Sequence, residues 1–441
     1  MTKPQQEEIH VTRSVRQETK SEAPRFHTVG IGAGPANLSL AALFEKASSL
    51  DMALFERQPQ PSWHRGLLYS GVQMQTSWLR DLVSLVDPSH RLSFLQYLVS
   101  TGRVWAFLNA QYESIPRLEF VQYLSWASDQ LAHVYYGTTV TRVSFDDGFW
   151  LYDGDRLLAR SDHLVLGQGT APYVPPSFQV DSDLMVVADE LHGWLDRLDR
   201  TDPSPQMSVA VAGGGQTGAE CVLELLGHRF RDIRWFGRRP WFAPLDDSPG
   251  ANEFYRPAYA QFFQQLPMDA RRDLVTRQVL TSDAITTSTI RALYQFNYEQ
   301  MLLTGRFPVK LFPGRDVVRA EDDGEGVRLT CEAAGGQEIH HADRLVVATG
   351  RRASPLPFGP ELLEMVELDE NGDLVVDSNL MVSFKGGDEH RIYAQNRARY
   401  SHGLTDANLS LLPMRSAIIL NSLFDREIFV VRDDWRSTIW G

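Results

Sequence analysis

A run of apolar residues followed by a glycine turn opens the ordered part of the sequence. In residues 26–47 a β-branched, apolar segment leads into glycines, and apolar positions then recur at Leu38, Leu40, Ala42 and Leu43. A second apolar run at residues 52–55 ends in Glu56. This pattern predicts a strand, a tight turn, a helix and a second strand, which together form a βαβ unit.

The same pattern returns in residues 207–226, with the next strand expected at 233–236. Two such units predict two bound nucleotides. Apolar runs at 163–167 and 344–348 each end at a glycine-containing turn. Because ligands of open α/β sheets lie at the carboxyl ends of strands, we expect the chain to cross between domains at these two places. Residues 251–304 show helical spacing and predict a small helical subdomain.

Composition excludes several classes of protein. The 441 residues carry a net charge of −13, which argues against a nucleic-acid-binding surface. Cys221 and Cys331 are the only cysteines and lie far apart, so a disulfide framework, a metal site and a dithiol redox centre are not expected. The polar N-terminus has no signal-like apolar segment, and the sequence has no run of about 18 apolar residues to span a membrane. We expect a cytoplasmic enzyme.

The first glycine turn, Gly32-Ala33-Gly34-Pro35-Ala36-Asn37, predicts a dinucleotide site that we interpret as the FAD site. Gly32 permits the turn, and Gly34 lets the backbone approach a pyrophosphate at the helix N-terminus. Glu56 is placed to accept hydrogen bonds from a ribose. Asn37 stands where a third glycine is usual, and we expect it to loosen the packing of helix on strand slightly.

The second turn contains all three glycines, Gly213, Gly215 and Gly218. The strand after it ends in Arg238 and Arg239 instead of an acid, which favours the 2′-phosphate of NADPH over NADH. A solvated pair of arginines is the alternative. Gln216 and Thr217 are expected to face the phosphates and the nicotinamide, or simply to begin the helix. Thr349 and Gly350 are expected to lie against a cofactor.

The predicted fold is therefore of the α/β class, with two Rossmann-like domains and a small helical subdomain. We expect a disordered tail at 1–25, an FAD-binding domain at 26–182 and 342–424, an NADPH-binding domain at 183–250 and 305–341, and a substrate-binding insert at 251–304.

Two Rossmann-like units alone also fit an NADPH-dependent flavoprotein reductase. The residues outside the two glycine turns must therefore distinguish the enzyme classes. The stretches WHRG at 63–66, MQTSWLRDL at 74–82, GGGQTGAE at 213–220, TSDAIT at 281–286 and SHGLTDANLSLL at 401–412 resemble the microbial N-hydroxylating flavin monooxygenases of siderophore synthesis. The resemblance is strongest to the lysine N6-hydroxylase branch. It implies FAD, NADPH and O2 as reactants, a flavin C4a-hydroperoxide that hydroxylates a neutral amine, and assembly as a dimer or tetramer.

The resemblance also implies roles for individual residues. Trp63, His64, Met74 and Gln75 match a stretch against the flavin, although Trp63 and Met74 could be plain core residues. His402, Leu409 and Ser410 fall in a segment that closes over the flavin and the amine. Asn252 matches a substrate-contacting asparagine of the ornithine enzymes, whereas Ser282 agrees with the lysine branch.

Arg80 stands where the amino-acid hydroxylases have a lysine that holds the substrate carboxylate. We therefore expect L-lysine as substrate, with L-ornithine and then a diamine such as cadaverine or putrescine as alternatives. A surface pair of Arg80 with Asp81 or Asp87 is the competing interpretation. Arg351 replaces a tyrosine of the family, and the sequence offers no reason for it.

Overall fold

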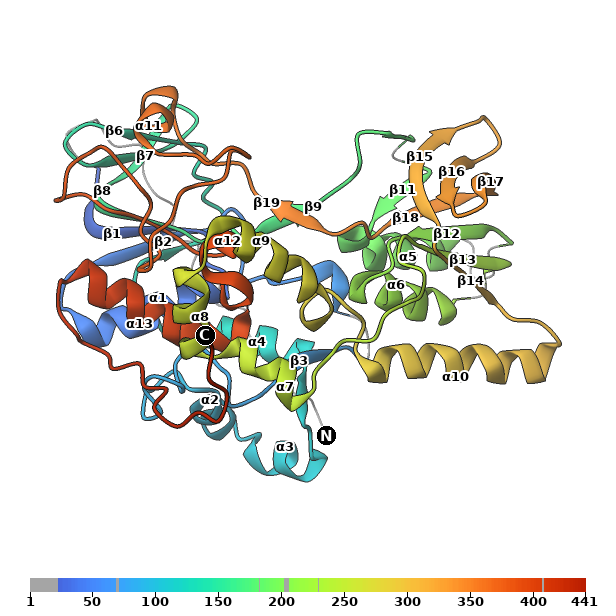
Figure 1. The fold of residues 1–441 in the computed structure, drawn as a ribbon, viewed down its shortest axis with the longest axis horizontal. Coiled ribbons are helices and arrows are strands. Elements are labelled where there is room, and N and C mark those ends of the chain that lie inside the picture. Colours follow the sequence, from blue (N-terminus) through green and yellow to red (C-terminus); the bar gives the residue numbers. More distant parts are fainter. Residues whose placement is uncertain (1–22, 69–70, 182, 202–205, 229, 407) are drawn as a thin grey trace, which may run out of the picture.

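Two lobes lie side by side in the structure, a computed structural model that describes residues 23–441 except 69–70, 182, 202–205, 229 and 407. Figure 1 shows the larger lobe on the left, around a seven-stranded sheet, and the smaller lobe on the right, around a five-stranded sheet. The expected tail lies outside the described residues as far as residue 22, and the first strand already begins at Arg25.

The seven-stranded sheet combines segments from both ends of the chain. β1 pairs in parallel with β2 and β8, and β20, from the last quarter of the sequence, pairs in parallel with β8. Helices α1 (Pro35–Ala47) and α13 (Leu412–Leu423) pack together beneath it and share one hydrophobic core. The strands are β1 (Arg25–Ile31), β2 (Met52–Phe55), β5 (Val134–Tyr135), β6 (Arg142–Phe145), β7 (Phe149–Asp153), β8 (Arg156–Leu166) and β20 (Ile392–Ala394).

The five-stranded sheet of the smaller lobe is parallel throughout. Its strands are β11 (Met185–Val187), β12 (Ser208–Ala212), β13 (Asp232–Gly237), β14 (Val309–Pro313) and β18 (Arg344–Val347). Helices α5 (Leu191–Thr201) and α6 (Gln216–Leu226) cover one face. The other face packs on a four-stranded sheet of β10 (Phe178–Gln179), β15 (Asp316–Asp322), β16 (Val327–Ala333) and β17 (Gly336–Ala342).

A short two-stranded ribbon joins the lobes. β9 (Thr170–Pro172) and β19 (Arg351–Ala353) pair antiparallel between them (Figure 1). Two expected domain limits differ from this arrangement, because β10 and β18 both pair within the smaller lobe. The chain thus leaves the larger lobe at β9, not at residue 182, and returns at β19, not at residue 342. Glycine marks where a strand ends, but it does not say which sheet the strand joins.

The helical segment 251–304 does not form one subdomain. Helices α7 (Pro249–Asn252), α8 (Pro257–Gln265) and α9 (Met268–Arg277) lie against the larger lobe and its short helix α12 (Arg399–His402). Helix α10 (Thr287–Thr304) packs instead on α6 of the smaller lobe, where Leu293 joins the core. The expectation of a single helical unit was wrong because periodicity predicts a helix but not its packing partner.

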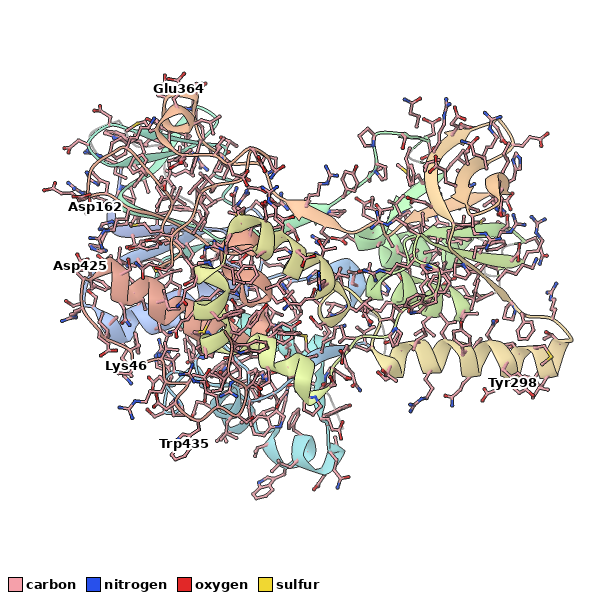
Figure 2. The ribbon with its side chains drawn as sticks, in the orientation of Figure 1. Lys46, Asp162, Tyr298, Glu364, Asp425 and Trp435 are labelled. Atoms are coloured by element: carbon pink, nitrogen blue, oxygen red, sulfur yellow. The ribbon has the colours of Figure 1, made fainter. Side chains whose placement is uncertain are left out.

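The C-terminal segment after α13 packs against α8 and the residues just before it. The carboxylate of Asp433 accepts hydrogen bonds from Arg256 and from the backbone N–H of Ala258. Trp440 packs against Tyr259 with ring centroids 4.9 Å apart, whereas Trp435 points outward and is 95% exposed (Figure 2). This segment thus fixes the position of α8 on the larger lobe.

Helix α11 (Pro360–Met365) lies beside β6 at the top of the larger lobe in Figure 1, whereas α2 (Phe94–Ser100), α3 (Val104–Ala110) and α4 (Arg117–Ser128) lie below the sheet. Strands β3 (Gln73–Ser77) and β4 (Ser114–Pro116) pair antiparallel and contact α4. Helix α2 packs on α4 and on α3. Among the described residues, no helix has both the length and the apolar character needed to cross a membrane.

Candidate active site

The first glycine turn forms an open cradle at the N-terminus of α1. Gly32 has φ +92°, and a Cβ there would lie 2.6 Å from the carbonyl oxygen of Gly167, so only glycine fits. Gly34 caps α1 without a side-chain hydrogen bond, and a Cβ on it would meet no atom within 4 Å. The free N–H groups after Gly34, with Pro35 in the first turn of the helix, therefore face open space and can bind an anion.

A cavity of about 650 Å³ extends from this turn along the carboxyl ends of the strands. Glu56, directly after β2, lies on its wall and accepts a hydrogen bond from Ala33 N–H at 2.9 Å. Helix N-terminus, acid and apolar wall together suit a dinucleotide with a pyrophosphate and a ribose, so the residues present fit FAD. Further lining residues include Trp63, His64, Gly169, Arg351 and Leu409.

Asn37 does the opposite of what its position in the motif predicted. Its side chain is fully buried and donates hydrogen bonds to the carbonyl oxygens of Ile31 and Gly32, at 3.2 and 2.8 Å. Its Oδ1 accepts from Gln395 at 3.0 Å. The amide therefore joins the turn at the end of β1 to Gln395, the residue directly after β20. The expectation that Asn37 loosens the packing was wrong, because an amide can satisfy buried backbone groups that glycine cannot.

The second turn has the same construction. Gly213 has φ +133°, and a Cβ there would lie 2.0 Å from the carbonyl oxygen of Ala348. Gly218 lets α6 approach β12, since its Cβ would lie 2.0 Å from the carbonyl oxygen of Gly213. Gly215 caps α6 and faces open space. The turn therefore forms a second anion-binding helix N-terminus.

The two arginines after β13 differ in their contacts. Arg239 donates to the carbonyl oxygen of Asp283 at 2.9 Å. Arg238 is exposed and has no ion pair within the described part of the chain. A free guanidinium beside a helix N-terminus suits the 2′-phosphate of NADPH.

Gln216 is less free than its position predicted. Its Nε2 donates to Glu220 at 2.8 Å and to Thr289 at 3.2 Å, and its Oε1 accepts from Thr286 N–H at 2.8 Å. The side chain thus connects α6 to the start of α10. Thr217, the next residue, lines the cavity between the lobes.

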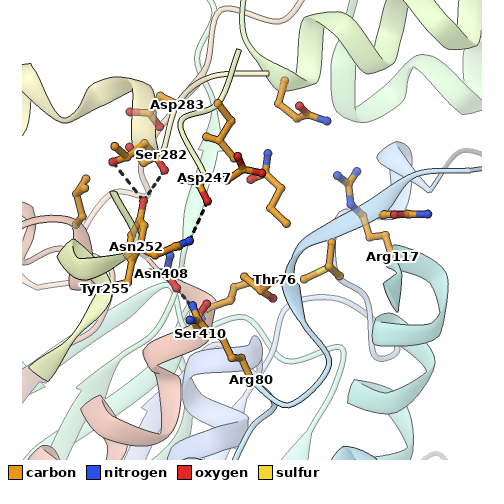
Figure 3. A pocket seen from close by; sticks show the side chains of 18 of the residues that line it. Thr76, Arg80, Arg117, Asp247, Asn252, Tyr255, Ser282, Asp283, Asn408 and Ser410 are labelled. Carbon is orange, nitrogen blue, oxygen red and sulfur yellow. Dashed lines mark hydrogen bonds between the residues drawn. The ribbon is translucent and has the colours of Figure 1, made fainter. Parts of the chain in front are cut away.

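That central cavity, of about 350 Å³, gathers the residues predicted at the flavin ring and the substrate, except His402 (Figure 3). The larger lobe contributes Trp63, His64, Met74, Gln75 and Arg80, and the smaller lobe contributes Gln216, Thr217 and Glu220. The segment before α10 adds Asp246, Asp247, Asn252, Tyr255, Ser282 and Asp283, and the C-terminal region adds Leu404, Asn408, Leu409 and Ser410. Trp63, His64 and Leu409 line this cavity and the FAD cavity, so the two spaces adjoin.

Arg80 brings a free positive charge into the central cavity. Asp81 accepts from Ser84 and from the N–H of Phe94, and Asp87 pairs with Lys46. Neither aspartate pairs with Arg80, so the surface-pair interpretation was wrong. Among the described residues Arg80 has no ion pair at all.

The other arginines on the wall are neutralised. Arg399 pairs with Asp283 at 3.0 Å, and Arg117 pairs with Glu220 at 2.8 Å. Arg80 is thus the cavity arginine that a carboxylate ligand can bind.

Two hydroxyl groups on the cavity wall lack partners. The Oγ atoms of Ser282 and Ser410 are buried, and neither makes a hydrogen bond within the described structure. Asn252, in contrast, donates through Nδ2 to the carbonyl oxygen of Asp247 at 3.0 Å, and Tyr255 donates to the carbonyl oxygen of Thr281 at 2.5 Å. Unpaired buried hydroxyls are expected where a polar ligand completes the site.

His64 lies between the two cavities in a left-handed conformation with φ +50°. Burial, together with the charges of Arg351 and Arg117, lowers its pKa to about 4. The imidazole is therefore neutral near pH 7.

Trp63 packs edge-on against Phe120, with ring centroids 5.4 Å apart, and Met74 is 7% exposed within the main core. Trp63 and Met74 thus belong to the core and to the cavity wall at once.

His402 and the pair Thr349 and Gly350 do not lie where they were expected. His402 is 2% exposed, makes a hydrogen bond with Ser401, and lines neither cavity. Thr349 donates to the carbonyl oxygen of Tyr173, and Gly350 accepts from Tyr173 N–H at 2.9 Å. Thr349 and Gly350 therefore stabilise the crossing between the lobes and line neither cavity.

Arg351 now has a physical explanation. Its guanidinium donates to both carboxylate oxygens of Asp189, at 2.8 and 2.6 Å, and to the carbonyl oxygen of Thr170 at 2.7 Å. It thereby holds the ribbon β9–β19 against the smaller lobe. The buried pair of Arg117 and Glu220 was not foreseen either, because 103 residues separate the two in sequence.

Comparisons with known proteins agree with this geometry. Residues 25–353 match the family described as L-lysine 6-monooxygenase/L-ornithine 5-monooxygenase. The chain belongs to this family. It is 33% identical over 411 residues to the L-lysine N6-monooxygenase of Escherichia coli, covering 91% of this chain and 95% of that protein.

Two solved structures have the same fold. The FAD-bound cadaverine monooxygenase of the desferrioxamine pathway of Erwinia amylovora has a TM-score of 0.86 and 25% identity, covering 94% of this chain and 97% of that one. The ornithine N-hydroxylase of Kutzneria sp. 744, with reduced FAD, NADP+ and L-ornithine, has a TM-score of 0.83 and 29% identity, covering 91% and 99%.

Family membership confirms several predictions. The chain is a flavin-dependent N-hydroxylating monooxygenase of siderophore biosynthesis, with FAD and NADP(H) as cofactors and O2 as co-substrate. The reductase alternative is thereby set aside. The α/β fold with two dinucleotide-binding lobes is confirmed as well.

Proposed function

We propose that this monooxygenase hydroxylates the terminal side-chain amine of L-lysine. The observation that carries the proposal is the unpaired guanidinium of Arg80 in the central cavity, where the other two arginines are neutralised. An amino-acid substrate supplies the carboxylate that such a group binds through two N–H donors. A diamine has no carboxylate and would leave the charge of Arg80 uncompensated.

Each cradle has a role in this proposal. The turn at Gly32 and Gly34, with Glu56, holds FAD, and the turn at Gly213 and Gly215, with Arg238, holds NADPH. FAD held there and reduced by NADPH would activate O2, so that one oxygen atom of O2 enters the amine and the other leaves as water. The protein binds the amine, orients it and keeps water away.

The chain's own contribution to the chemistry is to present an uncharged amine. A lysine amine has a pKa of about 10.4, so removing its proton at pH 7 costs about 4.6 kcal/mol. The apolar wall of Trp63, Met74 and Leu409 disfavours the ammonium ion and lowers that cost. The unpaired hydroxyls of Ser282 and Ser410 are available to hydrogen-bond the substrate amino groups. No protein nucleophile is needed.

A diamine is the second candidate, and Asp247 is the observation in its favour. This aspartate lies on the cavity wall and has no ion pair among the described residues, so it could bind a second ammonium group. The similarity in fold to a cadaverine monooxygenase is consistent with this alternative. L-lysine satisfies both observations, because its carboxylate can pair with Arg80 while its α-ammonium pairs with Asp247.

A substrate panel tests the proposal. FAD-loaded protein is given NADPH with L-lysine, L-ornithine, cadaverine or putrescine, and hydroxylamine formed per NADPH oxidised is measured. We expect L-lysine to give the highest kcat/KM and a ratio near one. A higher kcat/KM for cadaverine would refute the lysine assignment. Assembly as a dimer or tetramer remains a prediction, which size-exclusion chromatography with light scattering of the same protein would test.

A further inference from the structure

A buried ion pair joins the two lobes at the edge of the central cavity. Arg117, the first residue of α4 in the larger lobe, meets Glu220 in α6 of the smaller lobe (Figure 3 shows Arg117). Nη2 donates to Oε1 at 2.8 Å and Nη1 donates to Oε2 at 3.0 Å. The side chains are only 12% and 3% exposed. The pair is therefore bidentate and largely removed from water.

Neighbouring groups complete the contact on both sides. Nη1 of Arg117 also donates to the carbonyl oxygen of Leu67 at 2.8 Å, and Glu220 Oε1 also accepts from Gln216 at 2.8 Å. Gln216 begins α6 directly after the second glycine turn. The pair thus links the NADPH cradle to the segment that carries Trp63 and His64.

That segment is itself inserted into the smaller lobe. The 3-10 helix η1 (Arg65–Leu67) belongs by sequence to the larger lobe, yet Leu67 is 3% exposed inside the core of the smaller one. A Cβ on Gly66 would lie 1.4 Å from the carbonyl oxygen of Asp189, so the two backbones are in direct contact. A rotation of one lobe against the other would have to separate this contact and the ion pair together.

We propose that Arg117 and Glu220 are positioning residues that set the orientation of the NADPH-binding lobe for hydride transfer to the flavin. Both line the central cavity, but each already uses its polar atoms on the other and on Leu67 or Gln216. Their effect on the reaction is through the distance between the two cofactor cradles. The proposal does not depend on which amine is the substrate.

The physical reason is the cost of an unpaired buried charge. If Arg117 is replaced while the lobes keep this orientation, Glu220 stays desolvated without its guanidinium, and removing one partner of a buried pair is far more damaging than removing both. Hydride transfer is in turn sensitive to small displacements, since a shift of about 1 Å can slow a reaction about a hundredfold.

The first measurement reports lobe orientation without any reaction. Fluorescence energy transfer is measured between labels at Glu364→Cys on the larger lobe and Tyr298→Cys on the smaller one, which lie at opposite sides of the molecule in Figure 2. Tyr298 is 55% exposed, and the native Cys221 and Cys331 are buried and do not compete for label. We expect Arg117→Met and Glu220→Met each to broaden the transfer distribution in FAD-loaded protein.

The second measurement is the rate constant of flavin reduction at saturating NADPH, followed by stopped flow. We expect each single variant to lower it at least about tenfold, with NADP+ affinity within about threefold of the parent because the cradle itself is intact. Arg117→Lys keeps the charge but loses the bidentate geometry. Its rate constant of flavin reduction should therefore lie between those of the parent and Arg117→Met. The double variant Arg117→Met/Glu220→Met should be no slower than the slower single variant, because both changes break the same contact.

Arg315→Met is the matched control. Arg315 pairs with Glu338 at 3.1 Å within the smaller lobe, where both side chains are 35% exposed. The Arg315→Met variant should leave the rate of flavin reduction and the energy transfer unchanged. Single variants with unchanged energy transfer would overturn the proposal whatever their rate. The proposal would also be overturned if the double variant reduced flavin more slowly than either single variant, by the product of the two losses.

Discussion

Replacing Arg80 by methionine separates recognition of the carboxylate from the rest of catalysis. The guanidinium lines the central cavity, and the nearby aspartates Asp81 and Asp87 are bound to other groups, so the change removes a charge without disturbing an internal ion pair. We expect KM for L-lysine to rise while the yield of hydroxylamine per NADPH falls, because a poorly held amine lets activated oxygen leave as peroxide.

The size of the effect follows from the contact that is lost. A hydrogen bond to a charged group contributes about 1.5 to 3 kcal/mol, and the bidentate contact has two of them that share one charge. A loss of about 2 to 4 kcal/mol corresponds to a fall in kcat/KM for L-lysine of about 30-fold to 700-fold. Cadaverine, which has the same reacting amine and chain length but no carboxylate, should be unaffected or improved.

The assay compares steady-state kinetics of L-lysine and cadaverine in the parent, Arg80→Met and Arg80→Lys. Arg80→Lys keeps a positive charge and should retain most activity on L-lysine. Arg91→Met serves as control, since Arg91 pairs with Glu45 at 2.6 Å on the surface of the larger lobe. An unchanged KM for L-lysine in Arg80→Met would show that the substrate carboxylate lies elsewhere.

Three further changes test the cradles and the pH response. Gly32→Ala should abolish FAD uptake and lower the Tm, because it forces a strained φ and a contact of 2.6 Å with Gly167, whereas Gly34→Ala should fold normally and only weaken FAD binding, as judged by flavin absorbance after desalting. Arg238→Ala should raise the Kd for NADPH at least about tenfold and leave that for NADH unchanged, as isothermal titration would show. Burial lowers the pKa of His163 to about 4. The unfolded chain therefore takes up that proton first as the pH falls from about 6.5 to about 4, and the free energy of unfolding falls over that range. In urea titrations His163→Asn should flatten this dependence, and a slope equal to that of the parent would contradict the assignment.

The local parts of this protein could be predicted from its sequence. At Gly32 and Gly213 the positive φ of the turn and a close backbone carbonyl both require glycine. The spacing of the glycines was therefore enough to predict both dinucleotide-binding turns. The sequence stretches around Trp63 and Arg80 resemble the N-hydroxylating flavin monooxygenases, and this resemblance predicted the enzyme class. Arg80, Ser282 and Ser410 were expected at the substrate site, and all three line the central cavity of the structure.

What could not be predicted depends on contacts between distant segments. Asn37 departs from the glycine pattern, and only its buried partners Ile31 and Gln395 explain it. His402 carries a side chain that often acts in catalysis, but its burial against Ser401 removes it from both cavities. The helical spacing of α10 fits packing on either lobe equally well. Nothing near Arg117 in sequence indicates that its partner is Glu220.

The parallel pairing of β20 with β8 has a consequence for biosynthesis. Until Ile392–Ala394 leaves the ribosome, the carboxyl end of β8 lacks its partner strand β20. Helix α1 likewise lacks α13, which covers it in the folded lobe. The smaller lobe, whose segments all precede β19, can be complete by then. The order of synthesis thus favours a nascent chain that acquires its nicotinamide cradle first and can retain flavin only after β20 and α13 have been synthesised.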